Sequence, residues 1–342
     1  MVQSPKSLSM KRILIVKVTS LGDIVEAQPV VADIKRAFPG VMVDWAADEM
    51  FADIARWNSS IDRVLCAPLR RFKKARSLAD FRSIAASIAE LRAERYDVVI
   101  DIHGVYKSAI IAFLARSSRR LGYLSQDLGE RGAAFAYTGR LAPRPKVNAW
   151  HGMRISVGDA LGFKVEGPPV FNLQVPGVAD STNGAAPVAM LFHATSKDEK
   201  KLPATHWAAI ARNLIARGYG IELPWGSQTE RIEAAAIAAL VPEAELLPPM
   251  AVIEVAQMIT RAALVVGVDT GFVHLAHALQ KRTIMIFVTT SPEHSGVEAP
   301  FRSISVGDGL SVPPVDEVLR AIEYVHTEPG AAAAGDATVA AA

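Results

Sequence analysis

Short runs of β-branched and aliphatic residues alternate with helical segments along this chain, and the alternation occurs twice. In the N-terminal half, strand-like runs at 12–18, 41–46 and 96–102 alternate with helical segments at 24–38, 53–57, 79–93 and 107–115. In the C-terminal half, runs at 188–193, 221–224, 264–268 and 283–287 alternate with helical segments at 206–217, 229–240, 251–260 and 273–279. Strands separated by helices form parallel sheets that helices cover on both faces. The sequence therefore predicts an α/β protein with two such sheets.

The two halves are separated by a stretch rich in helix- and strand-breaking residues, which we interpret as a linker at 171–187. We expect an N-terminal extension at 1–10, a first domain at 11–170 and a second at 188–314. A final helix at 315–326 is expected to pack back toward the N-terminal domain. The low-complexity tail at 327–342 is expected to be disordered. Two domains suit a chain of 342 residues.

Composition excludes several classes of protein. Half of the residues are hydrophobic and 21% are charged, which excludes a mainly disordered chain. A single cysteine, Cys66, excludes an internal disulfide and a zinc site built on several thiolates. The apolar runs are shorter than the roughly 18–20 residues of a membrane-spanning helix, and no signal-peptide core is present at the start. We therefore expect a cytoplasmic protein.

Charge is divided unevenly between the halves. Residues 1–175 hold 26 Lys and Arg against 17 Asp and Glu, whereas residues 176–342 hold 11 against 18. A basic half suggests an anionic partner, and a phosphorylated lipid, a membrane surface or a nucleic acid would each fit. The alternative is that the charge serves solubility alone.

The first candidate catalytic residue is Asp23, in the segment Thr19-Ser20-Leu21-Gly22-Asp23 that follows the first strand. A carboxylate at a strand end can take a proton from a hydroxyl nucleophile. The alternative is an ordinary acidic residue in the first turn of a helix.

Three further segments follow strands of the C-terminal half. Thr195, Ser196 and Lys200 lie in a polar loop that could hold a diphosphate. Thr270 and Gly271 begin a helix directly after Asp269, and free N–H groups at a helix start bind anions. His274 and His277 could hold a metal, but no third ligand is suitably spaced, and we expect no metal site.

The remaining segment contains Trp225-Gly226 followed by Glu230. The backbone at Gly226 could approach a ligand closely, and the Glu230 carboxylate could accept hydrogen bonds from ribose hydroxyls. The alternative is that Glu230 is a first-turn helix acid.

In the basic half, Arg70, Arg71, Lys73 and Lys74 form a cluster, and Arg120 lies on the same half. Phosphates on an acceptor explain this cluster better than DNA does, with a solvated loop as the alternative.

Taken in order, these motifs resemble the lipopolysaccharide heptosyltransferases of glycosyltransferase family 9. The matching segments are 15–23, 96–101 with Gly104 and Lys107-Ser108, 193–198 with Lys200, 223–226, and 268–271 with His274. His193-Ala194-Thr195-Ser196 and Leu223-Pro224-Trp225-Gly226 are most similar to heptosyltransferase I, as is the basic segment 70–76. The segments after Lys200 and at 122–144 depart from the family pattern.

The resemblance implies a GT-B fold, in which two Rossmann-like βαβ domains face a central cleft. It implies inverting transfer of heptose from ADP-heptose to a Kdo hydroxyl of Kdo2–lipid A, with Asp23 as the base. Asp269 would hold heptose hydroxyls, and Thr195, Ser196, Lys200, Glu230, Thr270, Gly271 and His274 would complete the donor site. The basic cluster and Arg120 would bind the acceptor. No cofactor is required, although magnesium could stimulate the reaction.

The implied location is the cytoplasmic face of the inner membrane, with peripheral contact and no nucleic-acid partner. The alternatives are heptosyltransferase II, which adds a second heptose, and a non-catalytic protein that binds a nucleotide or an anionic surface. An NAD-dependent oxidoreductase would need a Gly-rich fingerprint that is not found near the first strand.

Overall fold

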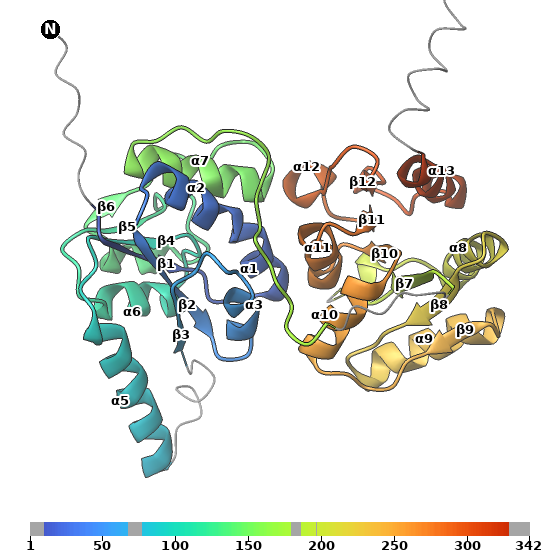
Figure 1. The fold of residues 1–342 in the computed structure, drawn as a ribbon, viewed down its shortest axis with the longest axis horizontal. Helices are drawn as coiled ribbons and strands as arrows, with labels where there is room; N and C mark the ends of the chain where they lie inside the picture. Colours follow the sequence, from blue (N-terminus) through green and yellow to red (C-terminus); the bar gives the residue numbers. More distant parts are fainter. Residues whose placement is uncertain (1–9, 68–76, 179–185, 196, 328–342) are drawn as a thin grey trace, which may run out of the picture. The chain divides into compact units, whose positions relative to one another are not determined.

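The computed structural model describes residues 10–67, 77–178, 186–195 and 197–327 (Figure 1). The chain divides into two compact units, residues 1–174 and 175–342. Within the described residues, each unit contains a six-stranded parallel sheet. No helix in these segments is long and apolar enough to cross a bilayer.

The strands of the first unit lie in the order β3-β2-β1-β4-β5-β6. Their bounds are β1 Arg12–Val16, β2 Met42–Asp48, β3 Arg63–Ala67, β4 Val98–Asp101, β5 Arg120–Gly122 and β6 Gly139–Arg140. The helices are α1 Leu21–Ala27, α2 Pro29–Ala37, α3 Ala52–Arg56, α5 Leu78–Ala93, α6 Tyr106–Leu114, the 3-10 helix η1 Arg131–Ala136 and α7 Ala149–Leu161. This strand order is that of the dinucleotide-binding Rossmann fold.

The strands of the second unit lie in the order β12-β11-β10-β7-β8-β9, which is the same order read from the other edge. They span β7 Val188–Phe192, β8 Gly220–Leu223, β9 Ala244–Leu246, β10 Leu264–Val268, β11 Arg282–Ile286 and β12 Ser303–Val306. The helices are η2 Asp198–Lys200, α8 Ala204–Ala216, α9 Gln228–Leu240, α10 Val252–Arg261, α11 Gly271–Ala278, α12 Pro292–Ser295 and α13 Val315–His326. The predicted α/β class and paired Rossmann-like sheets are therefore confirmed.

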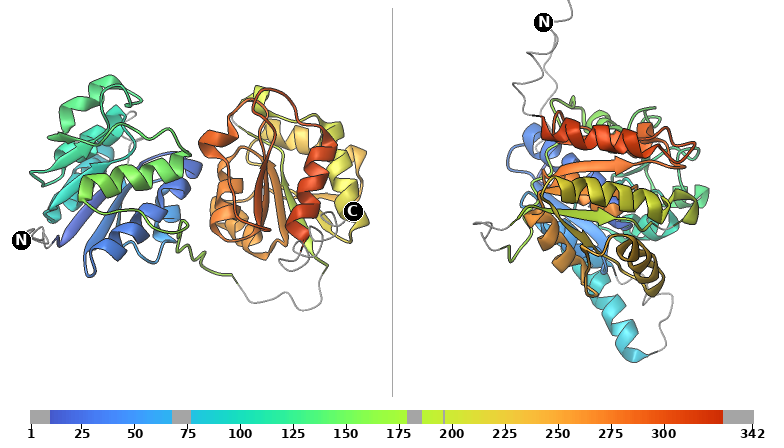
Figure 2. Two further views of the ribbon diagram at one scale, coloured as in Figure 1. Left: turned by 90° about the horizontal axis from the view of Figure 1, so that it is seen from above. Right: turned by 90° about the vertical axis from the view of Figure 1, so that its right-hand side faces the viewer.

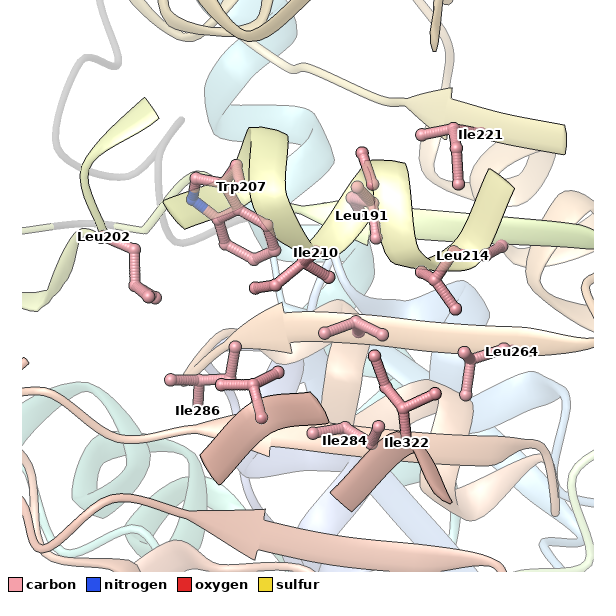
Figure 3. Close-up of a cluster of buried hydrophobic side chains, with 14 of the residues drawn as sticks. Leu191, Leu202, Trp207, Ile210, Leu214, Ile221, Leu264, Ile284, Ile286 and Ile322 are labelled. Carbon is pink, nitrogen blue, oxygen red and sulfur yellow. The ribbon is translucent and has the colours of Figure 1, made fainter. Parts of the chain in front are cut away.

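One face of the second sheet carries a large apolar core (Figure 3). Alternate strand residues such as Leu264 and Ile284 point to this face because side chains alternate across a strand. Trp207, Ile210 and Leu214 follow one side of α8 and cover them. Figure 2 shows the helices that flank this sheet from two further directions.

One predicted helix is divided in two in the structure, and the last helix packs within its own unit. The segment 24–38 forms two helices, since Pro29 has no N–H to continue α1 and instead begins α2. The last helix, α13, packs on α8, β11 and β12 within the second unit. Its apolar face, which includes Val318 and Ile322, belongs to the core of that unit.

A buried ion pair fixes the first unit in a way that the sequence did not indicate. Arg154 of α7 donates two hydrogen bonds to Asp33 of α2, Nε to Oδ2 at 2.6 Å and Nη2 to Oδ1 at 3.0 Å. Both side chains are only 1% exposed. Arg154 also donates to the carbonyl oxygens of Glu166 and Gly167. The pair therefore ties α2, α7 and the chain that leaves α7 together.

We predict that Asp33→Ala destabilises the first unit by about 3–5 kcal/mol, because it leaves a buried guanidinium without its counterion. The double variant Asp33→Leu/Arg154→Met should recover most of this loss, since an apolar pair removes both charges. Urea denaturation followed by circular dichroism measures both effects. Equal losses in the single and double variants would show that the charge is not the cause.

Candidate active site

The candidate residues of the first unit lie where the strand order of its sheet reverses. β1 pairs with β2 on one side and with β4 on the other. In such sheets, ligands bind at the carboxyl ends of the strands at this switch point. Asp23 follows β1, and His103 follows β4. The fold thus places both residues at the edge where ligand binding is expected.

Asp23 lies in the first turn of α1 and is held by a neighbouring lysine and serine. Its Oδ1 accepts a hydrogen bond from Lys17 Nζ at 2.8 Å, and its Oδ2 accepts from the backbone N and the Oγ of Ser20 at 2.9 and 2.8 Å. Burial alone would raise the pKa of Asp23, but Lys17 and Ser20 outweigh it and lower the pKa to about 2. Asp23 is therefore a carboxylate at neutral pH, and it also caps the helix.

His103 is a candidate residue that we did not select from the sequence. Burial, together with the positive charges of Lys17 and Lys107, lowers its pKa to about 4, although Asp23 acts in the opposite direction. The ring is therefore neutral at pH 7. Its Nδ1 is buried and has no hydrogen-bond partner within the described residues. The signal that could have identified it is its place after β4, the strand beside β1.

A buried carboxylate holds the loop that carries His103. Asp101 Oδ1 accepts hydrogen bonds from the backbone N atoms of His103 and Gly104 at 2.8 and 3.0 Å, and Oδ2 accepts from the Tyr137 hydroxyl at 2.7 Å. The pKa of Asp101 is raised by burial, which these bonds offset only in part. The position of His103 is thus fixed by bonds to its backbone.

The switch point of the second unit lies between β7 and β10 and carries a denser polar group. Asp269 follows β10 and accepts hydrogen bonds at Oδ2 from Lys200 Nζ at 2.9 Å and from Thr290 Oγ1 at 2.8 Å. His274 Nε2 lies 3.4 Å from its Oδ1. Burial would raise the pKa of Asp269, but the bonds from His274, Lys200 and Thr290 hold it well below its usual range.

The predicted anion-binding elements lie around this carboxylate. Thr195 follows β7 and donates from Oγ1 to the backbone oxygen of Asp269 at 3.2 Å. Thr270 precedes the first turn of α11, which begins at Gly271, so N–H groups of that turn are available to an anion. Ser196 lies outside the described residues. The structure thus brings Thr195, Lys200, Asp269, Thr270, Gly271 and His274 together.

Glu230 has a structural role at the start of α9. Its Oε2 accepts hydrogen bonds from the backbone N atoms of Gly226 and Ser227 at 2.6 and 3.1 Å, and its own N–H donates to Ser227 Oγ at 3.3 Å. This is a capping box, as the alternative interpretation of the sequence suggested. Glu230 therefore holds the Trp225-Gly226 turn whether or not it also contacts a nucleoside.

Of the predicted acceptor residues, Arg120 is the one that the structure describes. Arg70, Arg71, Lys73 and Lys74 lie outside the described residues. Arg120 donates from Nε to the Ala136 oxygen at 2.9 Å and from Nη1 to the Ser117 oxygen at 2.6 Å. These bonds give Arg120 a structural role on β5. Among the described residues, no group of three or more His, Cys, Asp and Glu could hold a metal ion.

Comparison with known proteins places this geometry in a family. Residues 84–306 match the model of glycosyltransferase family 9 (heptosyltransferase). Lipopolysaccharide heptosyltransferase 1 of Escherichia coli K12 is 32% identical over 283 residues, which cover 82% of this chain and 89% of the relative. The Pseudomonas aeruginosa protein of the same name is 32% identical over 295 residues, covering 83% of this chain and 81% of the relative.

Solved structures agree. The E. coli heptosyltransferase WaaC with ADP-2-deoxy-2-fluoro heptose is 30% identical and superimposes with a TM-score of 0.76, covering 91% of this chain and 99% of that one. The E. coli ADP-heptose heptosyltransferase II gives a TM-score of 0.70 at 17% identity, covering 92% and 98%, which shows a shared fold. The fold is therefore GT-B, and the chain belongs to the heptosyltransferases of glycosyltransferase family 9.

Proposed function

We propose that this glycosyltransferase moves L-glycero-D-manno-heptose from ADP-heptose to the Kdo of Kdo2–lipid A, the reaction of heptosyltransferase I. The observation that carries this proposal is the group of Lys200, Thr290 and His274 around Asp269, beside the first turn of α11. It combines a cation and free N–H groups for a diphosphate with a carboxylate for sugar hydroxyls. The relatives named above as heptosyltransferase 1 support the choice of reaction.

On the donor side, the reaction breaks the bond between the anomeric carbon of heptose and the diphosphate. ADP leaves with that electron pair, so its oxygens gain negative charge as the bond breaks. This charge would be stabilised by Lys200, by Thr195 and Ser196, and by the start of α11 at Thr270-Gly271. Asp269 would accept hydrogen bonds from heptose hydroxyls, and Glu230 would hold the loop that faces the nucleoside.

On the acceptor side, Asp23 would accept the proton of a Kdo hydroxyl while the oxygen attacks the anomeric carbon from the face opposite ADP. A carboxylate has about four acceptor positions. Lys17 and Ser20 supply three bonds, two of them at Oδ2, so that Oδ1 has capacity for the substrate hydroxyl. Inversion follows, since attack and departure occur on opposite faces of the sugar.

The remaining features of the proposal concern the acceptor, its membrane and the metal. The anionic groups of Kdo2–lipid A would bind to Arg70, Arg71, Lys73, Lys74 and Arg120. This binding would bring the enzyme into peripheral contact with the cytoplasmic face of the inner membrane. The protein's own cations would neutralise the diphosphate, with magnesium as a stimulant. Product analysis with Kdo2–lipid A and with its monoheptosylated form separates this reaction from that of heptosyltransferase II.

We predict that Asp23→Asn lowers kcat/KM for the acceptor by about 10²–10⁴, the usual effect of losing a general base. The affinity for ADP should stay close to that of the wild type, because Asp23 lies in the first unit and the nucleotide motifs lie in the second. Initial-rate kinetics and calorimetry with ADP measure the two effects. Turnover like that of the wild type would remove Asp23 as the base.

Asp80→Asn is a matched control. Asp80 accepts hydrogen bonds from the N and Oγ of Ser77 at the start of α5, as Asp23 does from Ser20. Asp80→Asn should weaken this cap and leave the activity unchanged.

Because the pKa of Asp23 is about 2, kcat/KM should also show no acidic limb from Asp23 between about pH 5 and 8. Protonation of Asp23, and loss of the stability that its ionised form contributes, should begin only as the pH falls below about 4.

A second prediction concerns the diphosphate. Lys200→Ala should lower kcat by about 10²–10³, since one charge-stabilising group contributes roughly 3–4 kcal/mol in comparable sites. It should also weaken ADP binding in calorimetry. Lys201→Ala is the control, because Lys201 Nζ is paired with Asp198 and Glu233 instead. If both variants bound ADP and turned over alike, Lys200 would not contact the diphosphate.

A third prediction concerns the basic cluster. The double variant Arg70→Glu/Lys73→Glu should raise the acceptor KM about tenfold or more and leave the ADP-heptose KM unchanged, since each basic side chain near an anionic surface contributes about 1 kcal/mol. The wild-type acceptor KM should worsen with salt, and that of the variant should worsen less. Arg320→Glu, on the exposed side of α13, is the control. An acceptor KM that responds to neither charge reversal nor salt contradicts the docking role.

A further inference from the structure

An apolar cavity of about 310 Å³ lies in the first unit, between α5 and α6 and above the ends of β2 and β3. Its size is at the lower end of the range for small-molecule sites, roughly 300–1,000 Å³. α5 contributes Ile84, Ile88 and Leu91, which recur at helical spacing and therefore share one side of the helix. α6 contributes Ile110 and Leu114 to the opposite wall. The walls are thus formed mainly by hydrocarbon side chains.

The helix that forms one wall is unusually exposed for its composition. Leu91 is the buried residue of α5, although the helix spans sixteen residues. Leu78 and Phe81 are 78% and 58% exposed. Figure 1 shows α5 extending away from the sheet of its unit, beside α6. The apolar side of α5 is therefore available to an apolar ligand.

More apolar surface continues along α6. Phe113 is 53% exposed, and its ring lies 5.8 Å from that of Phe135, which is 55% exposed. Contiguous exposed apolar groups of this kind mark interaction sites more often than isolated ones do. Phe113 and Phe135 therefore add exposed apolar surface on α6 and η1 beyond the cavity itself.

A positive charge lies in the lining of this cavity. Lys107 lines the cavity and is exposed. It lies in the first turn of α6, the helix that follows β4 and His103, and β4 pairs with β1, the strand that precedes Asp23. The cavity therefore opens at the same edge of the sheet as the candidate base. A ligand that combines a hydrocarbon chain with an anionic head group complements both features, with its chain between α5 and α6 and its head group near Lys107.

We propose that this cavity binds a fatty acyl chain of the lipid acceptor. The inference rests on the proposed function, since it takes the acceptor to be a phosphorylated glycolipid. Chain binding would orient the head group relative to Asp23 and add apolar contact area to the charge contacts. The acyl chain is thus a recognition element and takes no part in the chemical step.

The single cysteine provides a direct test of occupancy. Cys66 lines the cavity, where Arg56 Nη2 lies 2.7 Å from its Sγ, and it is the one cysteine of the chain. The rate of its reaction with a maleimide should fall at least fivefold in decyl phosphate below its micelle concentration. Inorganic phosphate at the same concentration should have no effect. Equal rates in decyl phosphate and in phosphate would contradict the proposal.

Variants of the wall provide the second test. Ile88→Glu should abolish the protection of Cys66 and raise the KM for the acylated acceptor about tenfold, while the KM for the fully deacylated acceptor stays unchanged. Ile232→Glu is the matched control, since Ile232 is 62% exposed on α9 in the second unit. Ser87→Phe, which fills the cavity without adding charge, should reproduce Ile88→Glu if the glutamate variant does not fold.

The outcomes separate this inference from the proposed function. Protection of Cys66 without transfer to either acceptor would leave the cavity as a chain site and overturn the reaction. Transfer with equal KM changes for acylated and deacylated acceptors would support the reaction and overturn the acyl site. If a phospholipid protected Cys66 and the KM values of the acylated and deacylated acceptors did not differ, the cavity would bind a chain of a membrane lipid. Its role in acceptor recognition would then be overturned.

Discussion

Parallel pairing of the first and fourth strands in each unit is the constraint on which the sites depend. Since β1 lies between β2 and β4, and β7 between β8 and β10, the chain must reverse its direction of winding at these strands. Loops that follow them are therefore left beside each other without a covering helix. The same rule brings Asp23 near His103 in one unit and Thr195 near Asp269 in the other. Residues that are 80 and 74 positions apart in the sequence thus come to the same edge of a sheet because of strand order.

Much of this was predictable from the sequence. β-branched runs separated by helical segments predicted the two sheets, and polar residues directly after strands predicted the group around Asp269. These signals are local, because each depends on spacing within one element or at its end. The break at Pro29 was also local and could have been identified, since proline cannot continue the hydrogen bonding of the preceding helix.

The rest depended on contacts between distant elements. Nothing in the neighbourhood of Arg154 indicates that its guanidinium is buried against Asp33, since the two residues meet only when α7 packs on α2. Arg120 was selected as a phosphate ligand, and the structure adds that its Nε and Nη1 donate to backbone oxygens around β5. The apolar face of α13 predicted burial, and the structure adds that this face belongs to the core of the second unit. A hydrophobic or charged pattern states that a group needs a partner, and only the packed structure identifies which one.

Three helices begin with a similar local arrangement, in which an acidic side chain accepts a hydrogen bond from the backbone N of the serine three positions before it: Asp23 from Ser20, Asp80 from Ser77 and Glu230 from Ser227. What distinguishes Asp23 is the ammonium group of Lys17, the residue directly after β1. A deep mutational scan scored by folded abundance should therefore show the loss of a cap at all three acids, with an added cost at Asp23, whose removal leaves the buried ammonium group of Lys17 without its counterion. The same library scored by product would separate them, so that the difference between the two maps isolates the chemistry from the fold.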